Sequence, residues 1–300
     1  MDITISLMNA DLRIDKYLRF YLKFAPLSQI YRILRTGKVK VNRKKVKQDY
    51  RLKAGDVINF HFDVQPFLEL PGKQPVFKQR FIVLHEDNDL LIVDKPAGLA
   101  SHGGTGIEDN LIAEIRTYLK DVNRESSLAN RLDRDTSGIV LVGKNKPFLR
   151  KLNDALRERT VKKYYLALVY GTLKEATGTI TENLQRVQKD FTTKSVVSDE
   201  GKLSSITYWT EKAYKQTTLL KIQLETGRMH QIRVQLAHQG NFIIGDKTYG
   251  TPEQLKNFKL NRLFLHATNI QLKHPTTGAI LNITAPLPEN LKKVLEQQTL

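Results

Sequence analysis

The stretch from Asn130 to Val142, N-R-L-D-R-D-T-S-G-I-V-L-V, constrains the fold most because it joins an acidic loop to an apolar segment. Ile139–Val142 is apolar and largely β-branched, which predicts a buried strand, and residues 136–138 predict the turn that leads into it. Asp133 then lies on a loop from which a rigid scaffold can direct a carboxylate at a ligand. An Asp before a strand can equally hydrogen-bond to its own turn, so this spacing leaves the function of Asp133 open.

The composition limits the class of protein. A chain of 300 residues with 40% hydrophobic content can bury a sizeable core, and its length predicts one large domain and one small domain. No apolar run approaches a membrane span, and the N-terminal residues do not have the pattern of a secretory signal, so we expect a cytoplasmic protein with no membrane partner. The absence of cysteine excludes disulfides, thiolate nucleophiles and cysteine-based zinc sites.

The charge indicates a polyanionic partner. The chain has 48 Lys and Arg against 31 Asp and Glu, a net charge of +17. A soluble enzyme with a generally basic composition is the alternative. The distribution favours nucleic acid, because residues 11–60 alone contain 14 basic and four acidic residues and so hold +10 of that charge.

The same basic segment has the pattern of a small α and β unit. Apolar spacing predicts one helix capped by Asp11 and ended by Pro26, a second helix capped by Ser28, and then a hairpin. The order of these signals, from L-R-I-D-K-Y-L to A-G-D-V-I, resembles the S4 RNA-binding domain. The alternative is a solvated basic face. The resemblance implies an S4 domain at residues 11–65, a linker at 66–80 and a second domain at 81–300, with RNA contacts from Arg13, Arg32, Arg35, Lys38 and Arg43.

The second domain begins with two apolar segments, Phe81–Leu84 and Leu90–Val93, that predict a hairpin. The loop H-G-G-T-G at 102–106 precedes a predicted helix and could bind a phosphate. It lacks both glycine patterns of nucleotide-binding loops, so we expect a mobile rim of an active site and no nucleotide cofactor. The seven histidines have no metal-ligand spacing, so no metal is expected.

Two further stretches contain candidate site residues. V-K-K-Y-Y-L-A-L-V-Y-G at 161–171 predicts a strand with Tyr165 on its apolar face, where a tyrosine is ordinarily part of the core. L-E-T-G-R-M-H-Q-I-R-V-Q-L at 224–236 contains His230 and Arg233, which could bind phosphate or be satisfied structural groups.

Together with R-L-D-R-D-T-S-G, these stretches resemble the motifs of the RluA family of RNA pseudouridine synthases, and the resemblance covers almost the whole chain. It is nearest to the C-type enzymes of large-subunit ribosomal RNA. It implies that Asp133 is the catalytic carboxylate, that Tyr165 stacks on the flipped uracil and can shuttle its proton, and that Arg228 pairs with Asp133. It also implies that Arg131 enters the RNA near the vacated position and that Lys163 contacts the RNA backbone.

The chain departs from the family pattern at two positions. Asn130 stands where the family has His, and Gln235 stands where His is common, so we assign no role to either. The fold implied by the resemblance is α+β: a small S4 domain, then a synthase domain with a mixed, mostly antiparallel sheet, flanking helices and an active cleft across the sheet.

The expected reaction breaks the N1–C1′ bond of a uridine and rejoins the uracil through C5. It is redox-neutral, so we expect neither a cofactor nor a metal. It does need one ionised carboxylate. We expect site-specific isomerisation in large-subunit (23S) ribosomal RNA or its precursor, performed by a monomer that extrudes the target uridine. A synthase that acts on tRNA and a non-catalytic RNA-binding ribosome assembly factor are the alternatives. A pure binder has no need of Asp133, Tyr165 and Arg228 together.

Overall fold

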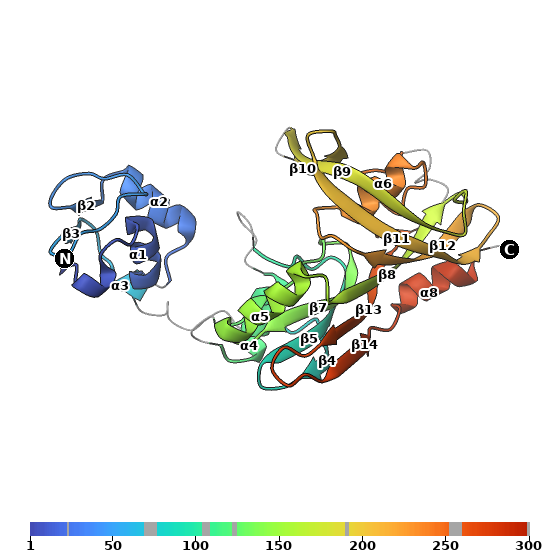
Figure 1. The fold of residues 1–300 in the computed structure, drawn as a ribbon, viewed down its shortest axis with the longest axis horizontal. Coiled ribbons are helices and arrows are strands. Elements are labelled where there is room, and N and C mark those ends of the chain that lie inside the picture. Colours follow the sequence, from blue (N-terminus) through green and yellow to red (C-terminus); the bar gives the residue numbers. More distant parts are fainter. Residues whose placement is uncertain are drawn as a thin grey trace. The chain divides into compact units, whose positions relative to one another are not determined.

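The computed structural model describes residues 1–22, 24–68, 77–103, 109–121, 125–189, 192–251 and 260–298. The chain divides into two compact units, Met1–Val76 and Phe77–Leu300 (Figure 1). Each unit has a hydrophobic core of its own. Across the described parts of both units, no helix has the length and apolar character needed to cross a membrane.

The first unit packs helices against a three-stranded antiparallel sheet with the strand order β1-β3-β2. Its core contains the apolar faces of α1 and α2, with Ile14, Leu18 and Ile30 each fully buried, against Ile58 of the central strand. In chain order its elements are β1 (Asp2–Thr4), the 3-10 helix η1 (Leu7–Asn9), α1 (Ile14–Tyr21), α2 (Leu27–Arg35), β2 (Val39–Val41), β3 (Val57–Phe60) and α3 (Gln65–Leu68).

The sequence-based expectations for this unit differ from the structure in its details. Asp11 does not cap α1, because its backbone has φ +64° and its carboxylate accepts a hydrogen bond from Arg51 at 2.9 Å. Pro26, and not Ser28, occupies the N-cap position of α2. The first ten residues, left outside the expected domain, contribute β1. The expected linker at 66–80 starts within α3, and residues 69–76 lie outside the described residues.

The second unit is built on an 11-stranded sheet over its described residues, with the main order β10-β9-β11-β12-β8-β13-β7-β5-β4. Neighbouring strands are antiparallel except for the parallel pair β13 and β7, which confirms the expected mixed, mostly antiparallel sheet with flanking helices (Figure 1). Its elements are β4 (Ile82–Glu86), β5 (Leu90–Lys95), α4 (Leu111–Tyr118), β6 (Ser127–Leu128), β7 (Ser137–Gly143), α5 (Lys146–Arg157), β8 (Lys162–Tyr170), β9 (Thr177–Lys189), β10 (Thr192–Val197), β11 (Lys202–Ala213), β12 (Thr217–Leu224), α6 (Gln231–His238), β13 (Leu265–Lys273), β14 (Ile280–Thr284) and α8 (Glu289–Glu296).

The run Ile139–Val142 of strand β7 is apolar because both faces of the strand pack against buried side chains. Successive side chains of a strand point to opposite faces, so Val140 and Val142 belong to the core that includes α4. Ile139 and Leu141 belong to the core that includes Phe148 of α5. A strand buried on both faces carries a continuous apolar run, which is the pattern that predicted it.

The turn before β7 is fixed against β13. Gly138 has φ +112°, and a Cβ at this position would overlap the backbone carbonyl of Ala267, so only glycine fits. The hydroxyl of Ser137 accepts a hydrogen bond from Arg262 at 2.7 Å and lies 2.9 Å from Nδ1 of the buried His266. These contacts fix the end of the loop that contains Asp133.

Candidate active site

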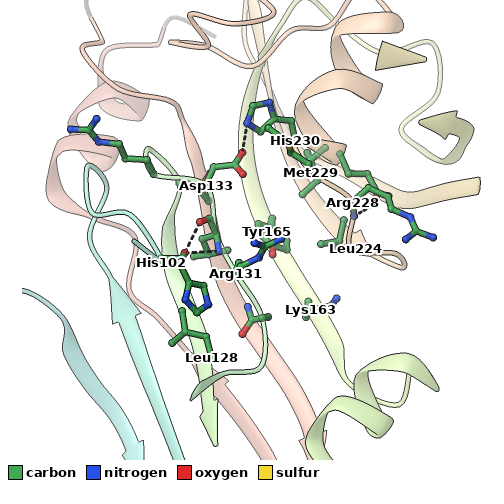
Figure 2. Close-up of a pocket in the computed structure, with 18 of the residues that line it drawn as sticks. His102, Leu128, Arg131, Asp133, Lys163, Tyr165, Leu224, Arg228, Met229 and His230 are labelled. Carbon is green, nitrogen blue, oxygen red and sulfur yellow. Dashed lines mark hydrogen bonds and ion pairs between the residues drawn. The ribbon is translucent and has the colours of Figure 1, made fainter. Parts of the chain in front are cut away.

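A cavity of about 810 Å³ opens in the second unit beside this loop (Figure 2). Its lining comes from segments far apart in the sequence, among them the loop at 128–136, strand β8 and the residues from Gly227 to Arg233 at the start of α6. The cavity brings together seven of the residues singled out from the sequence, namely Arg131, Asp133, Lys163, Tyr165, Arg228, His230 and Arg233. Of the H-G-G-T-G loop, His102 and Gly103 line the cavity, and 104–106 lie outside the described residues.

Hydrogen bonds on both sides of Asp133 hold its loop. The backbone N–H of Leu132 donates to the hydroxyl of Ser101 at 3.1 Å, and this hydroxyl donates to the carbonyl of Leu132 at 2.6 Å. After Asp133, the N–H of Thr136 donates to the carbonyl of Asp133 at 3.2 Å and closes a turn. The carboxylate of Asp133 therefore extends from a backbone that is bonded on either side.

Asn130 has a structural role that the sequence did not reveal. Its side-chain oxygen accepts the N–H of Leu141 at 2.7 Å, and its amide donates to the carbonyl of Ile139 at 3.4 Å. The side chain thus bonds to the backbone of β7 directly after the short pairing of β6 with that strand. Asn130 closes the loop against the strand that the loop enters.

Lys95 is a second residue that sequence reasoning missed. It is fully buried at the end of β5, and its Nζ donates to the carbonyls of Pro96, Leu99 and Arg134 at 2.9, 2.8 and 3.1 Å. Burial lowers the pKa of Lys95 to about 7, but three carbonyl acceptors match the three N–H groups of the ammonium and favour the charged form. Lys95 joins two loops behind the cavity, and the only sequence signal was a lysine at the end of an apolar strand.

Asp133 forms an ion pair with Arg233 of α6. Its Oδ2 lies 3.0 Å from Nη1 of Arg233. The guanidinium also donates to both carboxylate oxygens of the fully buried Asp246 at 2.8 Å and to the hydroxyl of Thr248 at 2.8 Å. Burial opposes the charge on Arg233, but its contacts with Asp246 and Asp133 raise its pKa above the ordinary value. A permanent cation beside Asp133 favours the ionised carboxylate.

The expectation that Arg228 pairs with Asp133 is wrong. In the described residues Asp133 pairs with Arg233, whereas the side chain of Arg228 is exposed and points away from Asp133 (Figure 2). The reason is where the helix begins. Arg228 is exposed and precedes the helix, and its backbone N–H donates to the side-chain oxygen of Gln231 at 3.0 Å. Arg233 lies in the buried first turn of α6. A role for Arg228 at the cavity rim stays a prediction.

Tyr165 and Lys163 reach the cavity from β8. Tyr165 is buried, and burial together with the charge of Asp133 raises the pKa of its hydroxyl, which therefore stays neutral. Lys163 is half-buried, and burial lowers its pKa. Both residues line the wall of the cavity (Figure 2). Their expected contacts with uracil and with the RNA backbone stay predictions.

His230 faces Asp133 across the cavity (Figure 2). Its Nε2 lies 3.8 Å from Oδ2 of Asp133, and its Nδ1 lies 3.1 Å from the hydroxyl of Tyr249. The residue precedes α6 and has φ +54°, in the left-handed region. Burial lowers the pKa of His230, so the ring is neutral near pH 7.

The expected RNA-binding residues outside the cavity belong to the first unit. Arg32, Arg35, Lys38 and Arg43 are exposed. Arg13 is half-buried and forms two hydrogen bonds with Asp15, at 2.8 and 3.1 Å, so part of its charge is neutralised. Contacts of all these residues with RNA stay predictions. In the part of the chain that the structure describes, no cluster of three His, Asp or Glu residues could hold a metal ion.

Comparisons with known proteins identify the family. Residues 89–238 match the family described as RNA pseudouridylate synthase, and residues 12–58 match the S4 domain. The ribosomal large subunit pseudouridine synthase C of Pasteurella multocida is 41% identical over 98% of this chain and 92% of its own length. The protein of that name from Escherichia coli K12 is 38% identical, over 98% and 95%. This chain therefore belongs to the RNA pseudouridine synthase family, which confirms the resemblance.

Solved structures show the same fold. The human RNA pseudouridylate synthase domain containing 1 has a TM-score of 0.60 and 22% identity and covers 75% of this chain and 90% of its own. The human domain containing 4 has a TM-score of 0.58 and 23% identity over 71% and 91%. The protein is an RNA pseudouridine synthase with an N-terminal S4 domain.

Proposed function

We propose that this enzyme isomerises specific uridines of large-subunit ribosomal RNA, with Asp133 as the catalytic carboxylate. The observation that carries the assignment of Asp133 is its ion pair with Arg233 at the wall of an open cavity. The side chain of Asp133 is 28% exposed, so the carboxylate that Arg233 contacts is still accessible. The names of the relatives from Pasteurella multocida and Escherichia coli support large-subunit ribosomal RNA as the substrate.

The chemistry needs a carboxylate at this place. Cleavage of N1–C1′ develops positive charge on the sugar, and an adjacent carboxylate can promote it by adding to C1′, by adding to the base or by taking a sugar proton. Arg233 holds the carboxylate of Asp133 in place by a hydrogen bond at 3.0 Å. Isomerisation exchanges no electrons with the surroundings, so we infer that no redox cofactor is required.

The cavity wall provides for an extruded base. A uridine in folded RNA must leave its stack before its glycosidic bond can be reached. We infer that Tyr165 supplies the apolar surface on which the uracil stacks, because its ring is held in β8 and its hydroxyl stays neutral. Arg131 is exposed at the cavity and is proposed to enter the RNA, while Lys163 contacts a phosphate.

RNA capture is assigned to residues 11–65. The S4 match covers 12–58, and the exposed Arg32, Arg35, Lys38 and Arg43 supply cations for phosphate contacts. We infer a monomer that acts in the cytoplasm, since the residues that line the cavity come from one chain and the proposed substrate is ribosomal RNA.

Mapping of pseudouridines tests the substrate. In a strain that lacks the gene, ribosomal and transfer RNA are treated with carbodiimide and compared with RNA from the same strain expressing the wild-type protein or Asp133→Asn. The proposal requires that sites in large-subunit ribosomal RNA disappear and return only with the wild type. Loss of pseudouridines from tRNA would favour a pseudouridine synthase that acts on tRNA. An assembly defect rescued by Asp133→Asn without any pseudouridine change would favour the non-catalytic factor.

A further inference from the structure

Tyr249 forms three polar contacts that fix the proton of a neighbouring histidine. Its hydroxyl oxygen lies 3.0 Å from the backbone N of Ser195, 3.0 Å from the backbone carbonyl of Ser195 and 3.1 Å from Nδ1 of His230. Ser195 is buried, and its strand β10 is at an edge of the sheet formed by the described residues, so the backbone groups that face Tyr249 lie on the side away from β9. A phenolic hydroxyl has one proton to donate and two lone pairs to accept with.

Only one arrangement satisfies all three contacts. If the hydroxyl of Tyr249 donates to the carbonyl of Ser195, it can accept both the Ser195 N–H and a proton on Nδ1 of His230. If it donates to Nδ1 instead, the buried Ser195 carbonyl loses its donor, which costs about 1–3 kcal/mol. The second arrangement would also place an Nε2–H toward Asp133 at 3.8 Å, too far for a hydrogen bond to compensate. The proton of the neutral ring therefore lies on Nδ1.

The lone pair of His230 then lies on Nε2, beside Asp133 in the cavity. The left-handed backbone of His230 costs roughly 1 kcal/mol or more for a residue with a side chain, and such strain is concentrated at functional sites. The other cavity groups are poorer bases. Tyr165 holds its proton tightly, Asp133 is paired with Arg233, and His102 is at the exposed rim.

We propose that Nε2 of His230 removes the C5 proton of the uracil after C5 has bonded to C1′. The inference rests on the isomerisation proposed above. The proton moves from C5 to Nε2, and the electron pair of the C5–H bond re-forms the C5=C6 double bond. The electrons of the N1=C6 bond return to N1, which takes a proton from solvent, and the imidazolium gives its proton to solvent. Every atom and electron balances without a further reactant.

The variant His230→Asn tests this role without disturbing the site. Asparagine tolerates a left-handed backbone, and its amide N–H can replace Nδ1–H as the donor to Tyr249, but it has no atom equivalent to Nε2. Thermal unfolding of the full chain checks that the variant folds. Tyr249→Phe is the companion variant, because it removes the acceptor of the Nδ1 proton and leaves the imidazole in place.

The decisive readout is a hydrogen isotope effect at C5. Transcripts of large-subunit ribosomal RNA, made with ordinary uridine or with deuterium at C5, are compared in single-turnover reactions. Loss of a general base slows its step by about 10²–10⁴-fold, so His230→Asn should become limited by C5 deprotonation and show a rate ratio of about 2 or more. We expect a ratio near 1 for the wild type and an intermediate effect for Tyr249→Phe.

The pH profile separates a base from a positioning residue. The charged and titratable groups that face His230 are Asp133, Asp246, Arg233 and Tyr249. If His230 is the base, protonation of its ring slows the wild-type enzyme at acid pH. The rate of His230→Asn should not show this decrease. A variant that is as fast as the wild type, or slow with no isotope effect, would overturn the proposal. A wild-type protein that makes no pseudouridine in any transcript would instead contradict the isomerase function itself.

Discussion

The carboxylate of Asp133 lies 3.0 Å from the guanidinium of Arg233, although 100 residues separate them in the sequence. On its other edge the guanidinium is bonded to Asp246, which has no exposed surface. Arg233 is therefore oriented by a buried carboxylate and directs an N–H of Nη1 toward an accessible one. This geometry orients the carboxylate of Asp133 and leaves a cavity beside it.

Replacing Arg233 by Lys should impair both activity and stability. Lysine keeps the positive charge, but it cannot form parallel bonds to Asp246 and reach Asp133 at the same time. We expect the free energy of unfolding to fall by about 1–3 kcal/mol and the single-turnover rate to fall at least about tenfold. Arg228→Lys is the matched control, with stability within about 0.5 kcal/mol of wild type. The opposite ranking of the two variants would contradict the assigned ion pair.

Replacing Gly138 by Ala should unfold or strongly destabilise the second unit. The new Cβ would overlap the carbonyl of Ala267 and would require φ +112°. Together these effects predict a loss of about 3 kcal/mol or more in urea unfolding. Gly98→Ala provides the control, because Gly98 has φ +85° but open space around a Cβ, and its loss should be about 1 kcal/mol. Equal losses in the two variants would show that the close approach to β13 is not needed.

Local patterns in the sequence predicted what depends on neighbouring residues. The run Ile139–Val142 identified a buried strand, and Asp133 was placed on the loop before it, because periodicity and turn residues act over a few positions. The motif at residues 224–236 likewise contained the correct cation. Which of its two arginines meets Asp133 depends on the left-handed residue that starts α6, and residue types alone do not determine that backbone angle.

Contacts between distant segments were not predictable from the sequence. Asn130 stood out only as a departure from the family pattern, and its role depends on where β6 leaves β7. Lysine side chains are ordinarily exposed, whereas Lys95 is fully buried. Its residue type therefore did not predict its position behind the active-site loop. Strand β1 has three residues, too few for any alternation to be recognised.

The free energy of unfolding of the second unit should decrease as the pH falls, because His266 is protonated more easily in the unfolded chain. This residue is fully buried, and burial lowers its pKa from the ordinary 6.5 to about 4. The unfolded chain therefore binds the proton more tightly. The contribution of His266 to the free energy of unfolding is complete above pH 6.5, falls as the pH drops, and is lost below pH 4. The total change is about 3 kcal/mol.

Urea unfolding between pH 7 and pH 4 checks this contribution. His266→Gln should be less stable at pH 7, because the contact with Ser137 is altered, but its stability should depend less steeply on pH than that of the wild type. Parallel curves for the two proteins would mean that His266 does not titrate in this range.

Removing basic residues of the S4 domain should weaken RNA binding in a salt-dependent way. Each phosphate contact releases counterions when RNA binds, so a variant that lacks one contact releases fewer of them. The slope of the logarithm of the binding constant against the logarithm of the salt concentration should then be shallower by about 0.7–0.9 for each lost contact. We expect this for Arg32→Gln, Arg35→Gln, Lys38→Gln and Arg43→Gln, measured by filter binding of a ribosomal RNA transcript. Arg51→Gln is the control, because Arg51 already pairs with Asp11. Unchanged slopes in the four variants would place RNA capture elsewhere.

The catalytic role of Asp133 has the most direct test in a single comparison. Asp133→Asn removes the charge and keeps the shape, while Asp135→Asn makes the same change two residues away on the exposed part of the turn. Pseudouridine formed in a single turnover on a large-subunit ribosomal RNA transcript is then measured. The account predicts that Asp133→Asn is at least about 10³-fold slower than the wild type, while Asp135→Asn stays within a few fold. Pseudouridine formation by Asp133→Asn at the wild-type rate would contradict it.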